Sequence, residues 1–253
     1  MSNESENAND EFLSHAQREL NNLTDRPKII KVSENGTLSI PKILEIYVHT
    51  VIAKTFKGSG WRVHINSPLS NNEGSENTIF RYRGAPSKRS STRNGFNHFI
   101  LHPPNSSHNQ ALELHLGVQV EGISSVFHEL DVLICKSLDD TSDISYHNVI
   151  LAAEIKRYAK STVDKQLARE FIGVLSDTTS LLTPLRSFNV FPNYEENKKW
   201  AFFLSTEGAN NRTNDIYKYL HIFNVKSFLN FKLSMECDLV SYITPIINEL
   251  NNR

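Results

Sequence analysis

Hydrophobic side chains recur at intervals of three and four residues between residues 39 and 61 (SIPKILEIYVHTVIAKTFKGSGW). The apolar positions of this stretch are Ile43, Leu44, Tyr47, Val48, Val51, Ile52 and Phe56. This periodicity predicts an amphipathic helix. Ser39 is placed to cap the helix, and Pro41 falls in its first turn. Gly58 and Gly60 mark its end.

The region before this helix is polar. Residues 1–9 are polar and acidic, so we expect them to be disordered. Residues 10–20 (DEFLSHAQREL) have the pattern of a short amphipathic helix. Residues 1–38 are therefore expected to form an N-terminal polar tail with a short helix.

Three consecutive strands are predicted in the middle of the chain. Apolar and polar residues alternate in residues 111–122 (ALELHLGVQVEG), which is the pattern of a half-buried strand. Two more apolar runs follow, at residues 127–135 (FHELDVLIC) and 148–156 (NVILAAEIK). The remaining strand candidates are residues 78–83, 97–101, 198–206 and 217–225.

Two further helices complete the expected fold. Residues 161–177 carry Ser161 and Asp164 as a capping box and an apolar stripe that can pack on a sheet. The stripe consists of Val163, Leu167, Phe171 and Val174. A terminal helix is expected at residues 241–252. The order helix, strands, helix, strand predicts an α/β fold with a central mixed sheet flanked by helices. We expect residues 39–253 to form a single domain with a loop-rich insertion at about 67–110.

Charge is distributed unevenly along the chain, although the 253 residues carry a net charge of only −1. No acidic residue occurs between Asn77 and Leu112. The basic residues of this segment are Arg81, Arg83, Lys88, Arg89 and Arg93. Together with nearby Tyr82 and Phe96, they form a candidate surface for a nucleic-acid backbone and its bases. The alternative is a solvated loop whose cations are countered by acids elsewhere.

Cysteine usage and hydropathy indicate a cytoplasmic protein. The two cysteines, Cys135 and Cys237, have no metal-type spacing, and we interpret both as reduced core residues. The apolar runs are shorter than the ~18 residues that a membrane-spanning helix needs. We therefore expect no interaction with a membrane.

Candidate chemistry lies at the end of the third predicted strand. Period-two alternation places Glu154 and Lys156 on one face, and the same alternation in the second strand places Asp131 with Glu129. If the two strands pair, Asp131 lies beside Glu154. Two close carboxylates repel each other, and a divalent cation removes that repulsion. Mg²⁺ suits such a site because it binds one or two carboxylates and keeps water and phosphate oxygens as its other ligands.

Other interpretations of these residues remain open. An ion pair at the end of a sheet would give the same sequence pattern. An acid-x-lysine tripeptide also occurs at Glu196-Asn197-Lys198, where we interpret it as a solvated loop. Glu129 is an alternative second carboxylate. Glu113 and His115 fall on the polar face of the first strand, where we expect exposure to solvent. The histidines of HFILHPPNSSH (98–108) lack a nearby acid or cysteine, which argues against a zinc site there.

The series of elements and residues resembles the PD-(D/E)XK nuclease superfamily, which has a restriction-endonuclease-like αβββαβ core. The resemblance covers roughly residues 40–206, and the ending EIKRY is similar to that of Mrr-like restriction nucleases. It implies that Asp131 and Glu154, helped by the carbonyl of Ile155, bind a catalytic Mg²⁺, for which Mn²⁺ can substitute. It implies that Lys156 assists the attacking water and the transition state. The chain departs from the family pattern at Leu130, where the motif has proline.

The resemblance also implies roles for two residues on helices. Glu45 on the first helix would complete or support the metal site, and Gln166 would lie at its edge. The alternative for Glu45 is a boundary residue of the helix beside a basic partner. The expected function is hydrolysis of phosphodiester bonds, with DNA favoured over RNA, in restriction or phage defence, and a homodimer would suit a duplex cutter. One alternative is a non-cleaving nucleic-acid-binding or scaffold protein that retains the fold. Another is a structural α/β protein.

Overall fold

The computed structural model describes most of the chain. The described residues are 3–23, 29–32, 39–66, 79–83, 85–90, 96–104, 111–139, 142–157, 163, 165–179, 199–206 and 213–252. Five helices are present among them: α1 (Asn3–Leu23), α2 (Ile40–Gly58), α3 (Lys165–Thr178), α4 (Thr213–Ile222) and α5 (Glu236–Asn251). A 3₁₀ turn, Leu233–Met235, precedes α5.

Most of the strands belong to one mixed sheet. Its nine strands are β2 (Arg62–Asn66), β4 (Ser87–Lys88), β5 (His98–His102), β6 (Leu112–Glu121), β7 (Phe127–Lys136), β8 (Ile144–Ser145), β9 (Val149–Lys156), β10 (Trp200–Ser205) and β11 (Lys226–Phe228). The order along the sheet is β11-β10-β9-β7-β6-β5-β2, and the short β4 and β8 both pair with β6. Separately, β1 (Ile29–Val32) and β3 (Ile79–Tyr82) pair in parallel.

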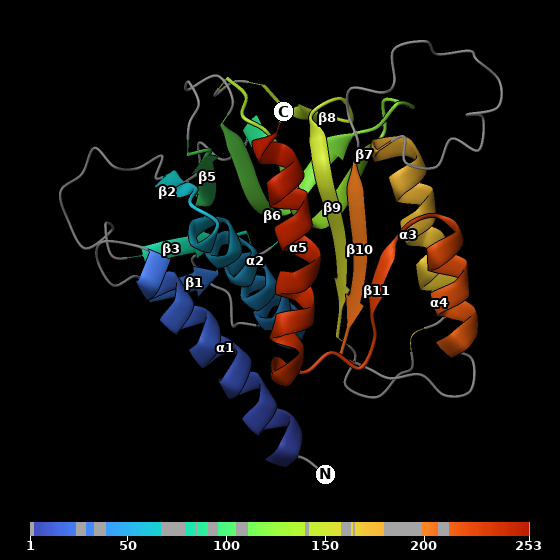
Figure 1. Cartoon of the computed structure of the whole chain (residues 1–253). Coiled ribbons are helices and arrows are strands. Elements are labelled where there is room, and N and C mark those ends of the chain that lie inside the picture. The colour runs from blue at the N-terminus through green and yellow to red at the C-terminus, as the bar shows by residue number, and fades with distance from the viewer. Residues whose placement is uncertain are drawn as a thin grey trace.

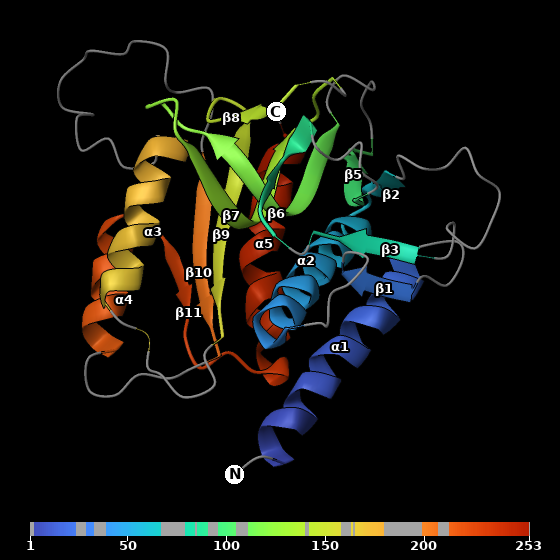
Figure 2. The same cartoon turned by 180° about the vertical axis from the view of Figure 1, so that it is seen from behind.

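Helices cover the central sheet on both faces (Figure 1). α2 and α5 lie against one face, with α1 packed outside α2, while α3 and α4 lie on the other face (Figure 2). The central strands β6, β7 and β9 pair antiparallel, and β9, β10 and β11 continue in parallel. The protein is therefore an α/β fold with a mixed central sheet flanked by helices, as the sequence predicts.

Alternation along β9 divides its side chains between two hydrophobic cores. Leu151, Ala153 and Ile155 contribute to the core beneath α1, α2 and α5. Ala152 contributes to the core beneath α3 and α4. Because Glu154 lies between Ala153 and Ile155, strand alternation points its side chain away from this first core, as the strand pattern predicts.

Several predicted elements have different boundaries or types in the structure. α1 begins at Asn3, so part of the expected disordered tail is helical. The strand expected at 217–225 is wrong, because that segment forms much of α4, where Ile216 and Leu220 are buried one helical turn apart. Ser39 does occupy the N-cap position of α2, but its side chain makes no capping hydrogen bond to the described residues.

On α3 the buried stripe is Ala168, Phe171, Ile172 and Leu175, and only Phe171 of it was expected. Cys135 is buried as expected, whereas Cys237 is exposed. The capping pair Ser161 and Asp164 lies outside the described residues. None of the helices in the described part of the chain combines the length and the apolar character needed to cross a membrane.

Candidate functional site

The two acidic residues singled out from the sequence lie on neighbouring strands. β7 and β9 pair antiparallel, with Val132 opposite Ala153. Extending this register by one residue places Asp131 opposite Glu154. Directly opposed residues of an antiparallel pair point to the same face of the sheet. The fold thus brings the two carboxylates together through strand pairing alone.

Lys156 lies between these two carboxylates. Its ammonium is 2.5 Å from Oε1 of Glu154 and 3.3 Å from Oδ2 of Asp131. The same Oδ2 of Asp131 accepts a hydrogen bond of 2.7 Å from the backbone N–H of Ile155. Asp131 is buried, whereas the side chains of Glu154 and Lys156 keep a fifth to a quarter of their surface in solvent. The ion pairs therefore form at the border between the core and solvent.

A second acid–lysine pair comes from the first turns of α2. Glu45 is buried, and Lys42, one turn earlier, forms a short ion pair with its carboxylate. Asp131 and Lys156 are both close enough to Glu45 to influence the pKa of its carboxyl group. Glu45 therefore belongs to the same electrostatic group as the strand residues. Glu45 is predicted from the sequence, whereas Lys42 is not, and the sequence signal for Lys42 is its position three residues before Glu45 on the predicted helix.

Gly117 of β6 lies where α2 packs on the strands. Leu116 pairs with Val132 and Val118 with Leu130, so Gly117 lies opposite Asp131. Its φ of 63° is in the left-handed region that favours glycine. A Cβ atom at this position would lie 3.5 Å from the ammonium nitrogen of Lys42. Lys42 therefore packs against β6 at the residue that lies opposite Asp131.

Negative charge exceeds positive charge in this group. Burial, followed by repulsion from Asp131, raises the pKa of Glu154 to about 8 despite the opposing effect of Lys156. Burial and Asp131 likewise raise the pKa of Glu45 to about 7, against the pull of Lys42 and Lys156. The pKa of Glu129, which is more exposed, is also raised by partial burial and by Asp131. Four carboxyl groups thus share two ammonium groups, and the excess negative charge favours binding of a proton or a metal cation.

This charge excess leads to a prediction for stability in the absence of metal. The carboxyl of Glu154 ionises near its ordinary pKa of 4.5 in the unfolded chain and at about 8 in the folded protein. Between these values the folded state binds a proton that the unfolded state has released, so stability falls as the pH rises through this window. We expect Glu154→Gln to remove this loss, so that the variant gains stability relative to wild type as the pH rises and the gain levels off above about pH 8.

Urea unfolding at several pH values between about 5 and about 9, with a chelator present, measures this difference. Glu170→Gln on the exposed face of α3 is the matched control. Its free energy of unfolding should change with pH in the same way as that of wild type. If the free energy of unfolding changes with pH in the same way for wild type and Glu154→Gln, the assignment of a raised pKa to Glu154 is contradicted.

Two further parts of the sequence bear on the motif, Gln166 as a residue expected at the site edge and the second acid-x-lysine tripeptide as an expected solvated loop. Gln166 is exposed on the first turn of α3, and its amide donates a hydrogen bond to Glu170. Glu196-Asn197-Lys198 lies outside the described residues.

The basic segment divides into buried and exposed side chains. Arg83 and Arg89 are only 1% and 3% exposed, so the structure removes these two from the expected contacts with a nucleic-acid backbone. The side chain of Lys88 is 45% exposed and forms an ion pair with Asp143, and Arg81 is half-buried. Arg93 lies outside the described residues. Tyr82, expected to stack on bases, is instead buried against His49 and Phe80.

Arg89 is buried because it binds Glu113, 24 residues away in the chain. The guanidinium donates to both carboxylate oxygens of Glu113 at 2.7 and 2.8 Å and to the backbone carbonyls of Leu138, Asp139 and Ser142. Glu113 and His115 were expected to be exposed, but both are buried. Burial is possible because the paired guanidinium and imidazole satisfy the carboxylate.

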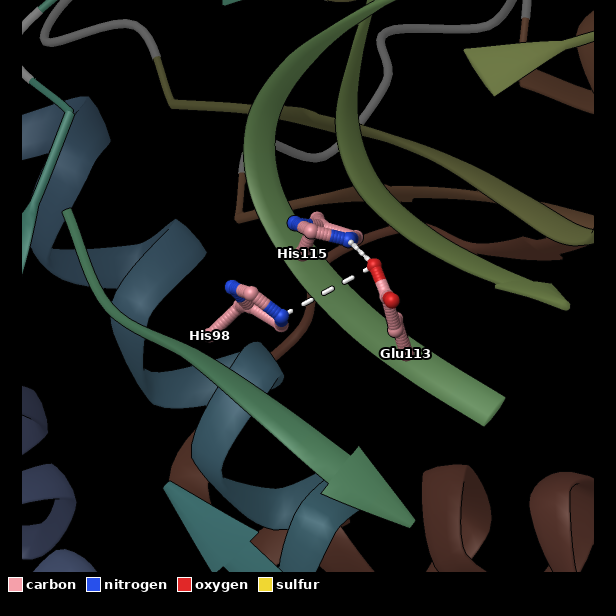
Figure 3. Close-up of side chains that lie close together, drawn as sticks. All are labelled: His98, Glu113 and His115. Atoms are coloured by element: carbon pink, nitrogen blue, oxygen red, sulfur yellow. Dashed lines mark hydrogen bonds and ion pairs between the residues drawn. The ribbon is translucent and has the colours of Figure 1, made fainter. Parts of the chain in front are cut away.

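His98, Glu113 and His115 converge in the interior, as Figure 3 shows. Among the described residues, this is the one group of three His, Cys, Asp or Glu side chains whose ligand atoms all lie within 4.8 Å of one another. Burial lowers the pKa values of both imidazoles. Their spacing and neutrality could therefore suit a metal ion.

The hydrogen bonds of Glu113 argue against a metal ion at this point. Its two oxygens already accept five hydrogen bonds, from two nitrogens of Arg89, from His115, from Ser137 and from the N–H of Leu138. Metal-bound histidines normally donate their second ring nitrogen to an acceptor, yet the Nδ1 atoms of His98 and His115 have no partner among the described residues. We interpret the group as a buried hydrogen-bonded network that ties the basic segment to the sheet.

The carboxylates beside Lys156 form a different kind of site. Asp131, Glu154 and Glu45 offer only oxygen ligands, and lysine ammonium groups separate them. Oxygen ligands at a water-accessible border suit Mg²⁺, which retains several of its own water ligands. This group is therefore the better candidate for chemistry.

The chain matches no family model, no curated protein and no solved structure in the three comparisons with known proteins. The resemblance to PD-(D/E)XK nucleases thus depends on the order of the elements and on the residues that they carry.

Proposed function

We propose that the protein is a Mg²⁺-dependent nuclease that hydrolyses phosphodiester bonds, with DNA as the favoured substrate. The observation that carries this proposal is the grouping of Asp131, Glu154 and Lys156 where β7 and β9 pair. One lysine ammonium contacts both carboxylates. The excess of negative charge around them explains why a divalent cation would bind there.

The fold supports the same proposal. Apart from the short or peripheral strands between them, α2, β6, β7, β9, α3 and β10 follow one another in the order αβββαβ, which is the order that the resemblance implies. β7 supplies Asp131, β9 supplies Glu154 and Lys156, and α2 supplies Glu45. These are the elements on which the PD-(D/E)XK motif places its acids and its lysine.

Each residue has a distinct proposed role. Asp131 and Glu154, with the carbonyl of Ile155, would hold Mg²⁺, which supplies Lewis-acid activation and charge neutralisation at a phosphate. Lys156 would orient the attacking water and stabilise the charge that develops on the phosphate. Glu45 would support the site from α2. Of the basic segment, Arg81 and Lys88 remain the described candidates for contacts to the nucleic-acid backbone.

The test is cleavage of supercoiled plasmid and of single-stranded DNA by the purified protein. We expect nicked or linear products with Mg²⁺ or Mn²⁺ and none with a chelator, because the carboxylates need a divalent cation to act on phosphate. By the same resemblance, the new ends carry 5′-phosphate and 3′-hydroxyl groups, which end-labelling distinguishes. Cleavage that persists in the chelator would contradict the proposal.

A second candidate is a nucleic-acid-binding protein that has the fold but does not cleave. The observation that favours it is the pairing of the carboxylates with Lys42 and Lys156, which partly neutralises the site without a metal. This candidate predicts that the protein shifts DNA in a gel and leaves it intact in both Mg²⁺ and Mn²⁺.

A further inference from the structure

Lys42 is a second cation at the proposed metal site. Its ammonium forms a short ion pair with Glu45, while Lys156 bridges Asp131 and Glu154. The side chain of Lys42 is 12% exposed, so its charge is largely removed from water. The site therefore has two fixed positive charges beside its carboxylates before any metal binds.

The position of Lys42 is shaped by the strands as well as by its own helix. Its ammonium nitrogen lies 3.5 Å from the point where a Cβ of residue 117 would be, and residue 117 lies opposite Asp131. Lys42 thus lies between Glu45 on α2 and the part of β6 that pairs with Asp131. Lys42 therefore fills space beside the Glu45 carboxylate that a metal ion on that carboxylate would need.

Helix stability does not account for a lysine at this position. Lys42 is in the first turn of α2, where the helix dipole disfavours positive charge. An ion pair three residues apart on a helix contributes only about 0.2–0.5 kcal/mol. Burial of the ammonium adds a desolvation cost that an exposed pair would not have.

We propose that Lys42 occupies the position of a second metal ion, so that the site binds a single divalent cation. Sites with two metals hold the ions about 3.5–4 Å apart through shared carboxylates. Here the carboxylate of Glu45, the natural ligand for the second ion, is already paired with Lys42. The ammonium would supply the second positive charge next to the substrate phosphate. Unlike a bound metal ion, it does not exchange with ions in solution, because it is part of the chain. This inference rests on the proposed metal-dependent function.

Metal stoichiometry tests the inference without reference to activity. Mn²⁺ binding to the full chain is measured by calorimetry, and electron paramagnetic resonance reports whether two bound ions are coupled. We expect one Mn²⁺ per wild-type chain. We expect two, with an exchange-coupled spectrum, for Lys42→Met, which keeps the aliphatic chain and frees Glu45.

Two further variants make the test specific. Lys57→Met removes another lysine of α2, an exposed one in its last turn, and should still bind one ion. The double variant Lys42→Met/Glu45→Gln should return to one ion, because the freed ligand is gone. Circular dichroism establishes that each variant is folded.

The outcomes separate the inference from the proposed function. One ion in both wild type and a folded Lys42→Met would overturn the inference and leave the function intact. Two ions bound to the wild-type chain would likewise overturn the inference and leave the proposed function intact. No Mn²⁺ binding by wild type would overturn the proposed metal-dependent function and, with it, this role of Lys42.

Discussion

Lys156→Met is expected to reduce Mg²⁺-dependent DNA cleavage by about 10²–10³-fold, the effect typical of removing one group that stabilises transition-state charge. Lys156 is the ammonium in contact with both Asp131 and Glu154, so it would lie next to the metal and to the phosphate that the metal activates. Methionine retains the length of the side chain and removes the charge. The measurement is the initial rate of plasmid nicking at saturating Mg²⁺.

The sequence contains its own control for this experiment. Lys198→Met changes the lysine of the second acid-x-lysine tripeptide, Glu196-Asn197-Lys198, and should leave the rate unchanged. DNA binding by Lys156→Met, measured in a gel shift with Ca²⁺ in place of Mg²⁺, should remain within a few-fold of wild type. Equal rates for wild type and Lys156→Met would remove Lys156 from the catalytic group, whereas equal losses in both lysine variants would indicate a general effect of charge.

Arg89→Met is expected to lower the free energy of unfolding by about 3–5 kcal/mol, the usual result of breaking one side of a buried ion pair. Arg89 donates to both oxygens of Glu113 and to three backbone carbonyls. Its loss leaves the Glu113 carboxylate buried with fewer donors and leaves three carbonyls without this partner. Urea unfolding at neutral pH measures the change.

The neighbouring residue provides the comparison for Arg89. Lys88→Met removes a cation whose ion pair with Asp143 is partly exposed, and such pairs contribute only about 0–1 kcal/mol. Adding Glu113→Gln to Arg89→Met should recover part of the lost stability, because the uncompensated charge is then absent. A loss for Arg89→Met no larger than that for Lys88→Met would contradict the structural role assigned to Arg89.

Elements with strong local patterns could be predicted from the sequence. Helix α2 and strands β6, β7 and β9 have regular apolar spacing, and pairing of adjacent strands in the chain then brings Asp131 beside Glu154. Segment 217–225 was assigned to the wrong class because it is rich in aromatic and branched residues, which have high β propensity. Its burial pattern repeats with the helical period instead.

The environment of a charged side chain could not be predicted in the same way. Arg89 has the local context of an exposed basic segment, but its partner Glu113 lies in a strand 24 residues later. Glu113 and His115 likewise occupy the polar positions of an alternating strand. That alternation does not reveal that another segment covers the polar face. Lys42 was missed because its proximity to the strands depends on how α2 packs over Gly117.

Both terminal helices anchor the helix that carries Lys42 and Glu45. Lys54 on α2 forms ion pairs with Glu19 on α1 and with Glu236 on α5, and Tyr47 donates a hydrogen bond to Glu236. A shortened protein that starts at residue 39 would retain all the candidate site residues and still lose one of these anchors. Trimming the N-terminal helix to obtain a minimal domain would therefore alter the support of the site itself.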